Sequence, residues 1–448
     1  MPLTLAAGER VTLPPIRLRR VLDTTGYVAT AFHEHALSSP DSPVPHEDRL
    51  ASLLVEGIEF FAGTDHDRLF DYDPLIDAYG VRGLIDAVVG IESTPFAYGH
   101  FNAYPLDIDP TDPTGGAVDW GRVPETGLAM LPGQIFDEQR DRGARVVQVC
   151  HPRSSGLGGF QAYFNRTGMT VDFVTRAITG VEAKQDVPTD WLRLPLDEPL
   201  YSDRYDAIEV WNNLGGGDSD GDGVREMVEL DRVLRDYMNF LSLGKLVVPL
   251  GNGDTHSRER SPAGLPRTLV RVSDDSDAGI AGGLDEDVWQ TLSGGAPRDV
   301  VVTDGPMIRV ATAGLPSAIG RTVTAGEGEA TFEIVASVAG WSDLDTIEIF
   351  ANQTFDPLVA GAPTALRPIA CATSRTNLSD KDPCLGGEAL TVATIDAGGG
   401  HTRREARWTF TLREADLPRR AGATGADAWM LVRARASRHH RSRRRPGR

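Results

Sequence analysis

Two histidines near the start of the chain, His33 and His35, are spaced for binding one metal ion. In an extended strand, residues i and i+2 point to the same side, so both imidazoles can reach the same ion. Asp41 follows in a loop rich in Ser and Pro, from which its carboxylate can fold back over that place. We therefore expect later segments to deliver further ligands to this site.

Later segments do carry matching residues, most of them directly after an apolar run. A single histidine is usually a hydrogen-bonded core or surface residue. Here, however, six of the ten histidines in the chain lie at or near the ends of predicted strands. The joint pattern predicts a metal site with nine ligands, which are His33, His35, Asp41, His66, Glu92, His100, His151, Asp254 and His256.

The segments that position these ligands alternate between strand and helix patterns. The predicted strands are 27–32, 58–63, 84–91, 145–150, 207–211 and 246–250, and the predicted helices are 46–56, 131–143 and 227–241. Polar residues follow the carboxyl end of nearly every strand. This layout is typical of an α/β barrel of (β/α) units whose site lies at that end.

From about residue 299, short alternating strands and Gly-rich turns replace the helices, which indicates a β-sandwich. A chain of 448 residues is expected to hold two domains. We expect an N-terminal strand segment at 1–26, which could be the remnant of a preceding domain. The metal-binding barrel at 27–298, the β-sandwich at 299–432 and a basic disordered tail at 433–448 would follow.

The charge of the chain separates an acidic body from a basic end. The net charge is −19, and subtracting the eight arginines of residues 433–448 leaves −27 for the rest. An acidic body argues against nucleic acid as the main partner and suits divalent cations. No apolar run reaches the length of a membrane span, and the N-terminus lacks the apolar core of a signal peptide. We expect a soluble protein, and a secreted or periplasmic location stays open if the N-terminus is incomplete.

The three cysteines do not form a disulfide framework. Cys150 ends an apolar strand and is expected to be buried. Cys371 and Cys384 flank a polar loop and could form a disulfide in an oxidising compartment.

Taken together, the ligand clusters resemble the PHP superfamily, named for its polymerase-associated and histidinol-phosphatase members. The motifs are His33-Glu34-His35, Thr64-Asp65-His66-Asp67, Gly90-Ile91-Glu92, Gly99-His100-Phe101, His151-Pro152-Arg153 and Gly253-Asp254-Thr255-His256. The segments Gly99–Asn102 and Glu209–Asn212 are similar to its carbaryl-hydrolase-like branch. The resemblance covers about residues 20–310 and implies a distorted (β/α)7 barrel that holds two or three metal ions.

The resemblance also implies how the ligands are shared. The first metal would take His33, His35, Glu92 and Asp254, the second Asp41, His66 and His256, and the third Glu92, His100 and His151. Phe32 stands where related proteins usually have an acidic or small polar residue, and Asp65 would orient a ligand histidine. This mixture of nitrogen and oxygen donors suits Zn²⁺, Mn²⁺ or Fe²⁺ without choosing among them.

Such a site is expected to be catalytic. Two divalent ions roughly 3.5–4 Å apart turn a bridging water into hydroxide, which can attack a phosphoryl or a carbonyl centre. We expect a hydrolase that cleaves a small-molecule phosphoester or a carboxylic or carbamic ester, with Asp254 and Asp65 as catalytic carboxylates. The alternative is a non-catalytic metal-binding barrel with an attachment role through the β-sandwich. The complete ligand set favours the enzyme.

Two groups of side chains bear on the substrate. Arg153 and Arg258 could hold an anionic group, or they could form surface salt bridges. The aromatic residues Phe96, Tyr98, Phe160, Tyr163 and Phe164 could line a pocket for an uncharged aryl group, or they could pack the loops.

A second ion site is predicted in an acidic loop before the 227–241 helix. Three carboxylates alternate with other residues, Gly223 stands at position six and Glu229 at position twelve, as in a calcium loop. Arg225 departs from this pattern, because an aliphatic residue is usual there, and the alternative is a solvated acidic turn. The predicted calcium ligands are Asp218, Asp220, Asp222, Val224, Glu226 and Glu229.

The calcium loop is expected to stabilise the fold rather than to take part in the chemistry. Asp220→Ala should therefore lower the melting temperature measured in calcium while leaving the catalytic rate per folded molecule unchanged. Thermal unfolding of both proteins with and without calcium tests this. A melting curve of the unchanged protein that does not respond to calcium would count against the site.

Overall fold

The computed structural model describes residues 8, 10–12, 19–95, 97–154, 162–181, 193–195, 198–213, 228–258, 263–293, 298–355, 365–379, 382–418 and 427–438. The calcium ligands predicted between Asp218 and Glu229 fall outside the residues whose side chains are described. Phe96, Phe160 and residues 439–448 of the tail also fall outside them.

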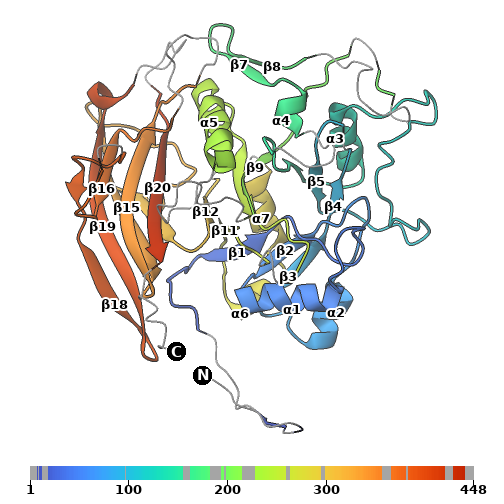
Figure 1. The fold of residues 1–448 in the computed structure, drawn as a ribbon, viewed down its shortest axis with the longest axis horizontal. Helices are drawn as coiled ribbons and strands as arrows, with labels where there is room; N and C mark the ends of the chain where they lie inside the picture. Colours follow the sequence, from blue (N-terminus) through green and yellow to red (C-terminus); the bar gives the residue numbers. More distant parts are fainter. Residues whose placement is uncertain are drawn as a thin grey trace, which may run out of the picture.

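Ten of the described strands form two five-stranded sheets in the N-terminal part of the chain (Figure 1). The first sheet has the order β12 (Val300–Thr303), β11 (Arg267–Arg271), β1 (Tyr27–Ala31), β2 (Phe60–Gly63) and β3 (Asp86–Val89). The second has the order β10 (Val248–Asn252), β9 (Ala207–Asn212), β6 (Val146–Val149), β5 (Phe101–Tyr104) and β4 (Ile91–Ser93). Buried apolar side chains of both sheets, among them Phe60, Tyr104 and Val270, share one core.

Hydrogen-bonded ladders between the described strands do not join the two sheets into the distorted (β/α)7 barrel that the resemblance implies. Continuous ladders of hydrogen bonds do not close a barrel among the described strands, and β4–β5, β5–β6 and β1–β11 pair antiparallel. The described residues between β4 and β5 include no helix, and this short connection allows antiparallel pairing. The strands β5 and β6 also pair antiparallel, although α3 lies between them in the chain. The sheets meet through the isolated parallel bridges Glu34–Thr255 and His66–Glu92.

One predicted strand, 84–91, is divided in the structure. Gly90 separates β3 from β4, and the chain passes there from the first sheet to the second. Its N–H donates to the carbonyl of Gly63 at 3.0 Å, and a side chain at this position would meet the same carbonyl at 3.1 Å. Glycine is therefore what allows the close approach and the change of sheet.

Helices cover the two sheets. They are α1 (His46–Glu56), α2 (Asp73–Tyr79), α3 (Pro132–Asp141), α4 (Tyr163–Arg166), α5 (Val228–Leu243), α6 (Asp277–Ala281) and α7 (Asp285–Leu292), with a small hairpin of β7 (Thr170–Asp172) and β8 (Ala177–Thr179). The helix α1 has the predicted bounds and buries Leu50 and Leu53. It ends at Gly57, whose φ of 72° suits glycine. No helix in the described part of the chain combines the length and the apolar composition needed to cross a membrane.

The C-terminal strands form two four-stranded sheets that share one apolar core. One sheet contains β13 (Met307–Thr312), β14 (Glu329–Ala339), β19 (His401–Arg413) and β18 (Val392–Gly398). The other contains β17 (Glu388–Ala389), β16 (Ala370–Thr373), β15 (Ser342–Ala351) and β20 (Met430–Arg438), and the short 3₁₀ helix η1 (Glu414–Asp416) follows β19. Ile334 and Trp408 from one sheet and Ile347 and Ile349 from the other fill the space between them.

Two features of the C-terminal strands bear on the sequence predictions. The sequence predicts a disordered tail from Arg433, but Arg433–Arg438 belong to β20. Arg433 and Arg435 contact the buried carboxylate of Glu348, which helps to hold this part of the chain on the sheet. Cys371 and Cys384 form a disulfide, with 5.4 Å between their Cα atoms.

The helix α5 lies between the C-terminal sheets and the N-terminal part of the structure (Figure 1) and contacts both. The amide of Asn239 accepts a hydrogen bond from the backbone N–H of Phe355 at 2.8 Å and donates one to its carbonyl at 2.9 Å. The same helix carries Asp236, which binds Arg153 near the predicted metal site. The α5 helix is thus fixed on both sides.

Candidate metal centre

Eight of the nine predicted ligands lie in or close to strands that meet at one place, and Asp41 lies in the loop between β1 and α1. The strands that contain or adjoin these ligands are β1, β2, β4, β5, β6 and β10. Three residues in these turns have positive φ angles, 48° at Asp67, 28° at His151 and 46° at Asp254. Non-glycine residues adopt this conformation at a cost of about 1–3 kcal/mol, and such residues cluster at functional sites. The backbone is thus strained where ligands leave the strands.

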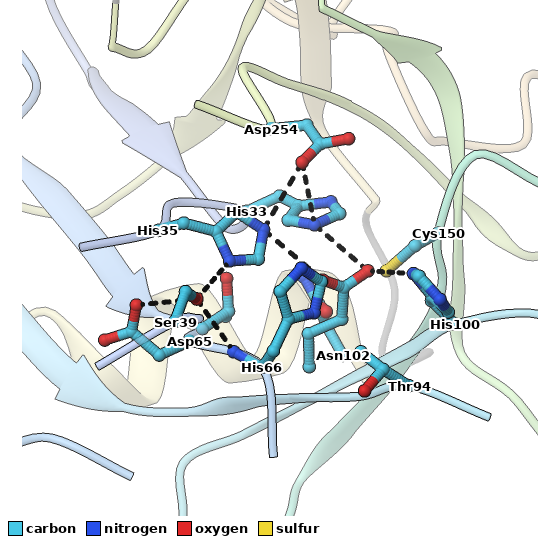
Figure 2. Close-up of polar contacts among 12 residues, drawn as sticks. His33, His35, Ser39, Asp65, His66, Thr94, His100, Asn102, Cys150 and Asp254 are labelled. Carbon is cyan, nitrogen blue, oxygen red and sulfur yellow. Dashed lines mark hydrogen bonds and ion pairs between the residues drawn. The ribbon is translucent and has the colours of Figure 1, made fainter. Parts of the chain in front are cut away.

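The carboxylate of Glu92 lies at the centre of the site and is fully buried. Five histidine nitrogens lie within 3.4 Å of its two oxygens, from His33, His35, His66, His100 and His151. Figure 2 shows His33 and His35 turned toward Asp254 on one side, with His66 and His100 on the other. The sequence prediction that these residues converge agrees with this arrangement.

The donors predicted for the first metal are evenly spaced. The Nε2 atom of His33 lies 3.2 Å from Glu92 Oε1 and 3.5 Å from Asp254 Oδ1. The Nε2 atom of His35 lies 3.3 Å from Glu92 Oε2 and 3.3 Å from Asp254 Oδ1. Donors bound at ~2.0–2.1 Å to one ion with tetrahedral angles would lie about 3.3–3.4 Å apart. The spacing therefore fits a single ion between these four side chains.

The donors predicted for the second metal form a similar triangle. Asp41 Oδ2 lies 3.3 Å from His66 Nε2 and 3.2 Å from His256 Nε2, and the two nitrogens are 3.5 Å apart. The side chain of Asp41 is 54% exposed and that of His256 is 30% exposed, whereas His33 and His35 are fully buried. The site is therefore open to solvent on the side of Asp41.

The two remaining histidines, His100 and His151, lie on the other side of Glu92. His100 Nδ1 is 3.0 Å from Glu92 Oε1, and His151 Nε2 is 3.4 Å from the same oxygen. Donor atoms also group His100 with His66 and Glu92, and His151 with His33 and Asp254. His151 is thus close enough to the first set of donors to be shared with it. Gly99 sets the position of His100, since its φ is 112° and a side chain there would meet the Tyr163 backbone nitrogen at 2.9 Å.

Some buried ligand atoms of the site lack a hydrogen-bond partner in the protein, and a metal ion would supply the missing interaction. Among the described residues, His33 Nε2 and His35 Nε2 are buried and have no hydrogen-bond partner, and both face carboxylate oxygens. Leaving a polar atom buried without a partner costs about 1–3 kcal/mol. Imidazole nitrogens and carboxylate oxygens are ligands of divalent transition metals, so bound ions would satisfy these atoms.

A hydroxyl and a carboxylate fix the orientation of His35. Ser39 Oγ donates to Asp65 Oδ1 at 3.0 Å, so it must accept at 2.9 Å from the Nδ1–H of His35, and the Nε2 lone pair faces the site. Asp65 also accepts from the backbone N–H of Ala36 at 2.6 Å and lies 3.4 Å from His46 Nε2. Asp65 therefore acts on the ligand His35 through Ser39, which lies between them. The sequence predicted that Asp65 orients a ligand, but it did not reveal the part played by Ser39.

The carboxylate of Glu209 was also missed as a site residue. It is fully buried and lies 2.7 Å from His33 Nδ1. The available signal was an acidic residue inside the otherwise apolar strand 207–211. A charged residue there needs a partner, because an isolated buried charge is very unfavourable.

The two arginines expected to bind substrate are paired with protein carboxylates instead. Arg153 contacts both oxygens of Asp236, with its Nε 2.7 Å from Oδ2 and its second nitrogen 2.9 Å from Oδ1. Arg258 forms an ion pair with Asp48. Their sequence positions beside His151 and His256 could not show these partners, which come from distant helices.

The aromatic residues do not line a pocket where they are described. Tyr98, Tyr163 and Phe164 are fully buried in the core beneath the loops. The interpretation as loop packing is therefore the correct one for these three residues. Cys150 is buried, as expected.

Burial and carboxylates shift the titration of the ligands in opposite directions. Burial lowers the pKa of His35 to about 4, with the neighbouring His256 adding to the effect. Burial also opposes a charge on His33, but Glu209, Asp254 and Glu92 raise the pKa of His33 well above its usual value. Burial raises the pKa values of Asp254 and Glu209, but His33 and His151, with further histidines beside Asp254, together hold both pKa values below their usual range. The carboxylates thus stay ionised and available to cations.

The sequence matches no known family model and no curated protein. Its structure is similar to a two-domain protein from Bacteroides vulgatus that contains a predicted PHP-like metal-dependent phosphoesterase, with 15% identity, a TM-score of 0.33, and coverage of 80% of this chain and 88% of that chain. It is also similar to a lesion-specific endonuclease from Pyrococcus furiosus, with 11% identity, a TM-score of 0.32, and coverage of 60% and 56%. Similarity at this level says nothing about the function of this chain.

Metal affinity is expected to rise with pH. Burial opposes the charged form of His66, but Glu92 and Asp41 raise its pKa to about 10 in the absence of a metal. An ion that takes His66 as a ligand at neutral pH must therefore displace a proton. The association constant for Co²⁺, measured by chelator competition between about pH 6 and pH 8, should increase at least about tenfold per pH unit.

Two variants sharpen this measurement. His66→Asn should reduce the slope by about one proton. His401→Asn, at an exposed strand position, should leave it unchanged. An affinity independent of pH in the original protein would contradict the proposed role of His66.

Proposed function

We propose that the protein is a metal-dependent hydrolase of the PHP type and that its substrate is a phosphoester. The observation that carries this proposal is the spacing of the donor atoms, because neighbouring atoms lie 3.2–3.5 Å apart in both the first and the second sets. Two such sets of donors suit a cluster of two or three divalent ions. Zn²⁺, Mn²⁺ and Fe²⁺ all suit these donors.

The arrangement of the strands supports the PHP type. If the bridges Glu34–Thr255 and His66–Glu92 are taken as connections, β1, β2, β4, β5, β6, β9 and β10 form a ring of seven strands. We propose that this ring is the distorted barrel of the superfamily. Because β12 belongs to the first sheet, the domain predicted at 27–298 would extend to Thr303. The sheets from β13 to the end of β20 at Arg438 would form a separate β-sandwich domain, in place of the predicted 299–432.

The side chains of the site would bind the metal ions in two sets. Divalent ions, when bound, would polarise the ester and lower the pKa of an attacking water. His33 and His35 would hold one ion by their Nε2 atoms, while Asp41, His66 and His256 hold another. Glu92 would help to hold the first ion and would accept from the Nδ1–H of His66, whose Nε2 faces the second set. The substrate would enter beside Asp41, where the site is open.

The charge pattern favours a phosphoester over a carbonyl ester. Phosphoryl transfer spreads negative charge over three oxygens, which several cations stabilise. Since Arg153 and Arg258 are paired with Asp236 and Asp48, the ions themselves would be these cations. The burial of Tyr98, Tyr163 and Phe164 removes the support for an aryl pocket. A carboxylic or carbamic ester and a non-catalytic metal-binding role remain alternatives for the test below.

The disulfide supports a location in an oxidising compartment. Cys371 and Cys384 are paired on the C-terminal sheet, and such bonds persist in secreted or periplasmic proteins. We propose such a location, with a small-molecule phosphoester as the partner.

The substrate class can be tested with one panel. The metal-loaded protein should hydrolyse nitrophenyl phosphate or a nitrophenyl phosphodiester, lose this activity with a chelator and regain it with metal. Naphthyl acetate and a naphthyl carbamate should be poor substrates. Asp254→Asn should lower hydrolysis by orders of magnitude, because its carboxylate oxygen faces both His33 and His35.

The control is Asp141→Asn, at an exposed position at the end of α3, which should leave the rate unchanged. Activity confined to the naphthyl esters would overturn the phosphoester proposal. A metal-loaded protein that cleaves none of the four compounds would favour the non-catalytic alternative. Near-normal turnover of Asp254→Asn with full metal occupancy would remove Asp254 from the mechanism.

A further inference from the structure

We infer that Glu209 is the positioning residue of the metal centre, whose carboxylate aligns three of the proposed ligands from three different strands. The inference rests on the proposed function only in that a metal binds at this site. Glu209 lies in the middle of β9, and its side chain is fully buried. No oxygen of Glu209 is needed as a ligand in the sets described above.

Five N–H groups point at this one carboxylate. Oε1 accepts from His33 Nδ1 at 2.7 Å, from the amide of Gln148 at 3.1 Å and from the amide of Asn252 at 3.0 Å. Oε2 accepts from the backbone N–H of His151 at 2.8 Å and from the amide of Asn212 at 3.0 Å. An ionised carboxylate offers about four lone-pair sites and no donor, so these partners saturate it.

The contact with His33 determines which ring nitrogen can bind a metal. Because the carboxylate can only accept, the proton of the neutral His33 ring must lie on Nδ1. Nε2 is then left with its lone pair, 3.2 Å from Glu92 Oε1 and 3.5 Å from Asp254 Oδ1. Glu209 thereby prepares His33 as an Nε2 ligand.

The other oxygen of Glu209 holds the remaining two ligands. Its bond to the backbone N–H of His151 fixes a residue whose φ of 28° is otherwise unfavourable. The Asn212 amide contacts Glu209 Oε2 at 3.0 Å and Asp254 Oδ2 at 3.1 Å, and so bridges the two carboxylates. Movement of Glu209 would therefore displace His33, His151 and Asp254 together.

Two other roles for Glu209 fit less well. His33, Cys150 and Glu209 are close enough to form a metal-binding group of their own, but the five donors already occupy the carboxylate. A role in stability alone would not require a charge, since burying one is costly even with a partner. The positioning role explains the charge, because each oxygen must accept from two or more donors.

The substitution Glu209→Gln separates these roles, because it keeps the shape and adds an N–H₂ group. That group must face one set of donors. If it faces His33, the ring accepts at Nδ1 and carries its proton on Nε2, where a metal can no longer bind. Glu209→Asp keeps the charge but shortens the side chain, so it should retain part of the function.

The matched control is Glu348→Gln. Glu348 is also a fully buried carboxylate on a strand, but it lies in the C-terminal sheets against Arg433 and Arg435. A loss of metal affinity caused by general destabilisation should appear in both Gln variants, whereas a positioning effect should appear only at residue 209.

The experiment is a Co²⁺ titration of the full-length proteins followed by chelator competition and visible absorption. It is combined with ¹⁵N NMR of histidine-labelled, metal-free protein at a pH high enough that the His33 ring is neutral, since its pKa is raised well above the usual value. We expect Glu209→Gln to weaken Co²⁺ binding about 10–100-fold and Glu209→Asp by a smaller factor, with Glu348→Gln unchanged. The His33 signal, assigned with His33→Asn, should change from the Nδ1–H to the Nε2–H form in Glu209→Gln.

Co²⁺ affinity of Glu209→Gln within about twofold of the original protein would overturn the inference, as would an equal loss in Glu348→Gln. If Glu209→Gln does not fold, Glu209→Asp decides, since unchanged affinity would refute the role and a weakened one would support it. A protein that binds Co²⁺ but hydrolyses nothing would refute the proposed function alone. Activity with unchanged affinity in Glu209→Gln would refute this inference alone.

Discussion

The attraction between one buried carboxylate, Glu92, and the histidines around it is the interaction on which the rest of the site depends. Five histidine nitrogens lie within 3.4 Å of its oxygens, although the carboxylate is fully buried. Such a group is costly to bury unless cations neutralise it. The strand ends, the positive φ angles and the surrounding hydrogen bonds can all be understood as means of holding donors around this charge.

The groups behind the ligands matter as much as the ligands themselves. Ser39, held by Asp65, and Glu209 place the proton of each of the first two histidines on Nδ1, so that both Nε2 atoms face the site. The contact between Glu209 and His33 joins two segments far apart in the sequence, β9 and the end of β1. The two sheets and the site are therefore stabilised by the same hydrogen bonds, which makes the fold a precondition of the metal geometry.

The sequence revealed the ligands more readily than the shape that holds them. The residues of the metal clusters could be predicted because most of them follow an apolar run, and α1 has its predicted bounds. The division of strand 84–91 at Gly90 and the antiparallel pairs depend on packing between distant segments, which local patterns do not contain. The same holds for Arg153 and Arg258, whose partners Asp236 and Asp48 lie on helices, and for Ser39, whose role appears only beside Asp65.

The central claim is that the buried donors bind metal ions between them, and anomalous X-ray diffraction from crystals of the Mn²⁺-loaded protein tests it most directly. The account predicts one anomalous peak between His33, His35, Glu92 and Asp254 and a second between Asp41, His66 and His256. A third, beside His100 and His151, would make the centre trinuclear. Crystals grown with Mn²⁺ that show no peak within about 3 Å of His33 Nε2, with water on the histidines instead, would contradict the account.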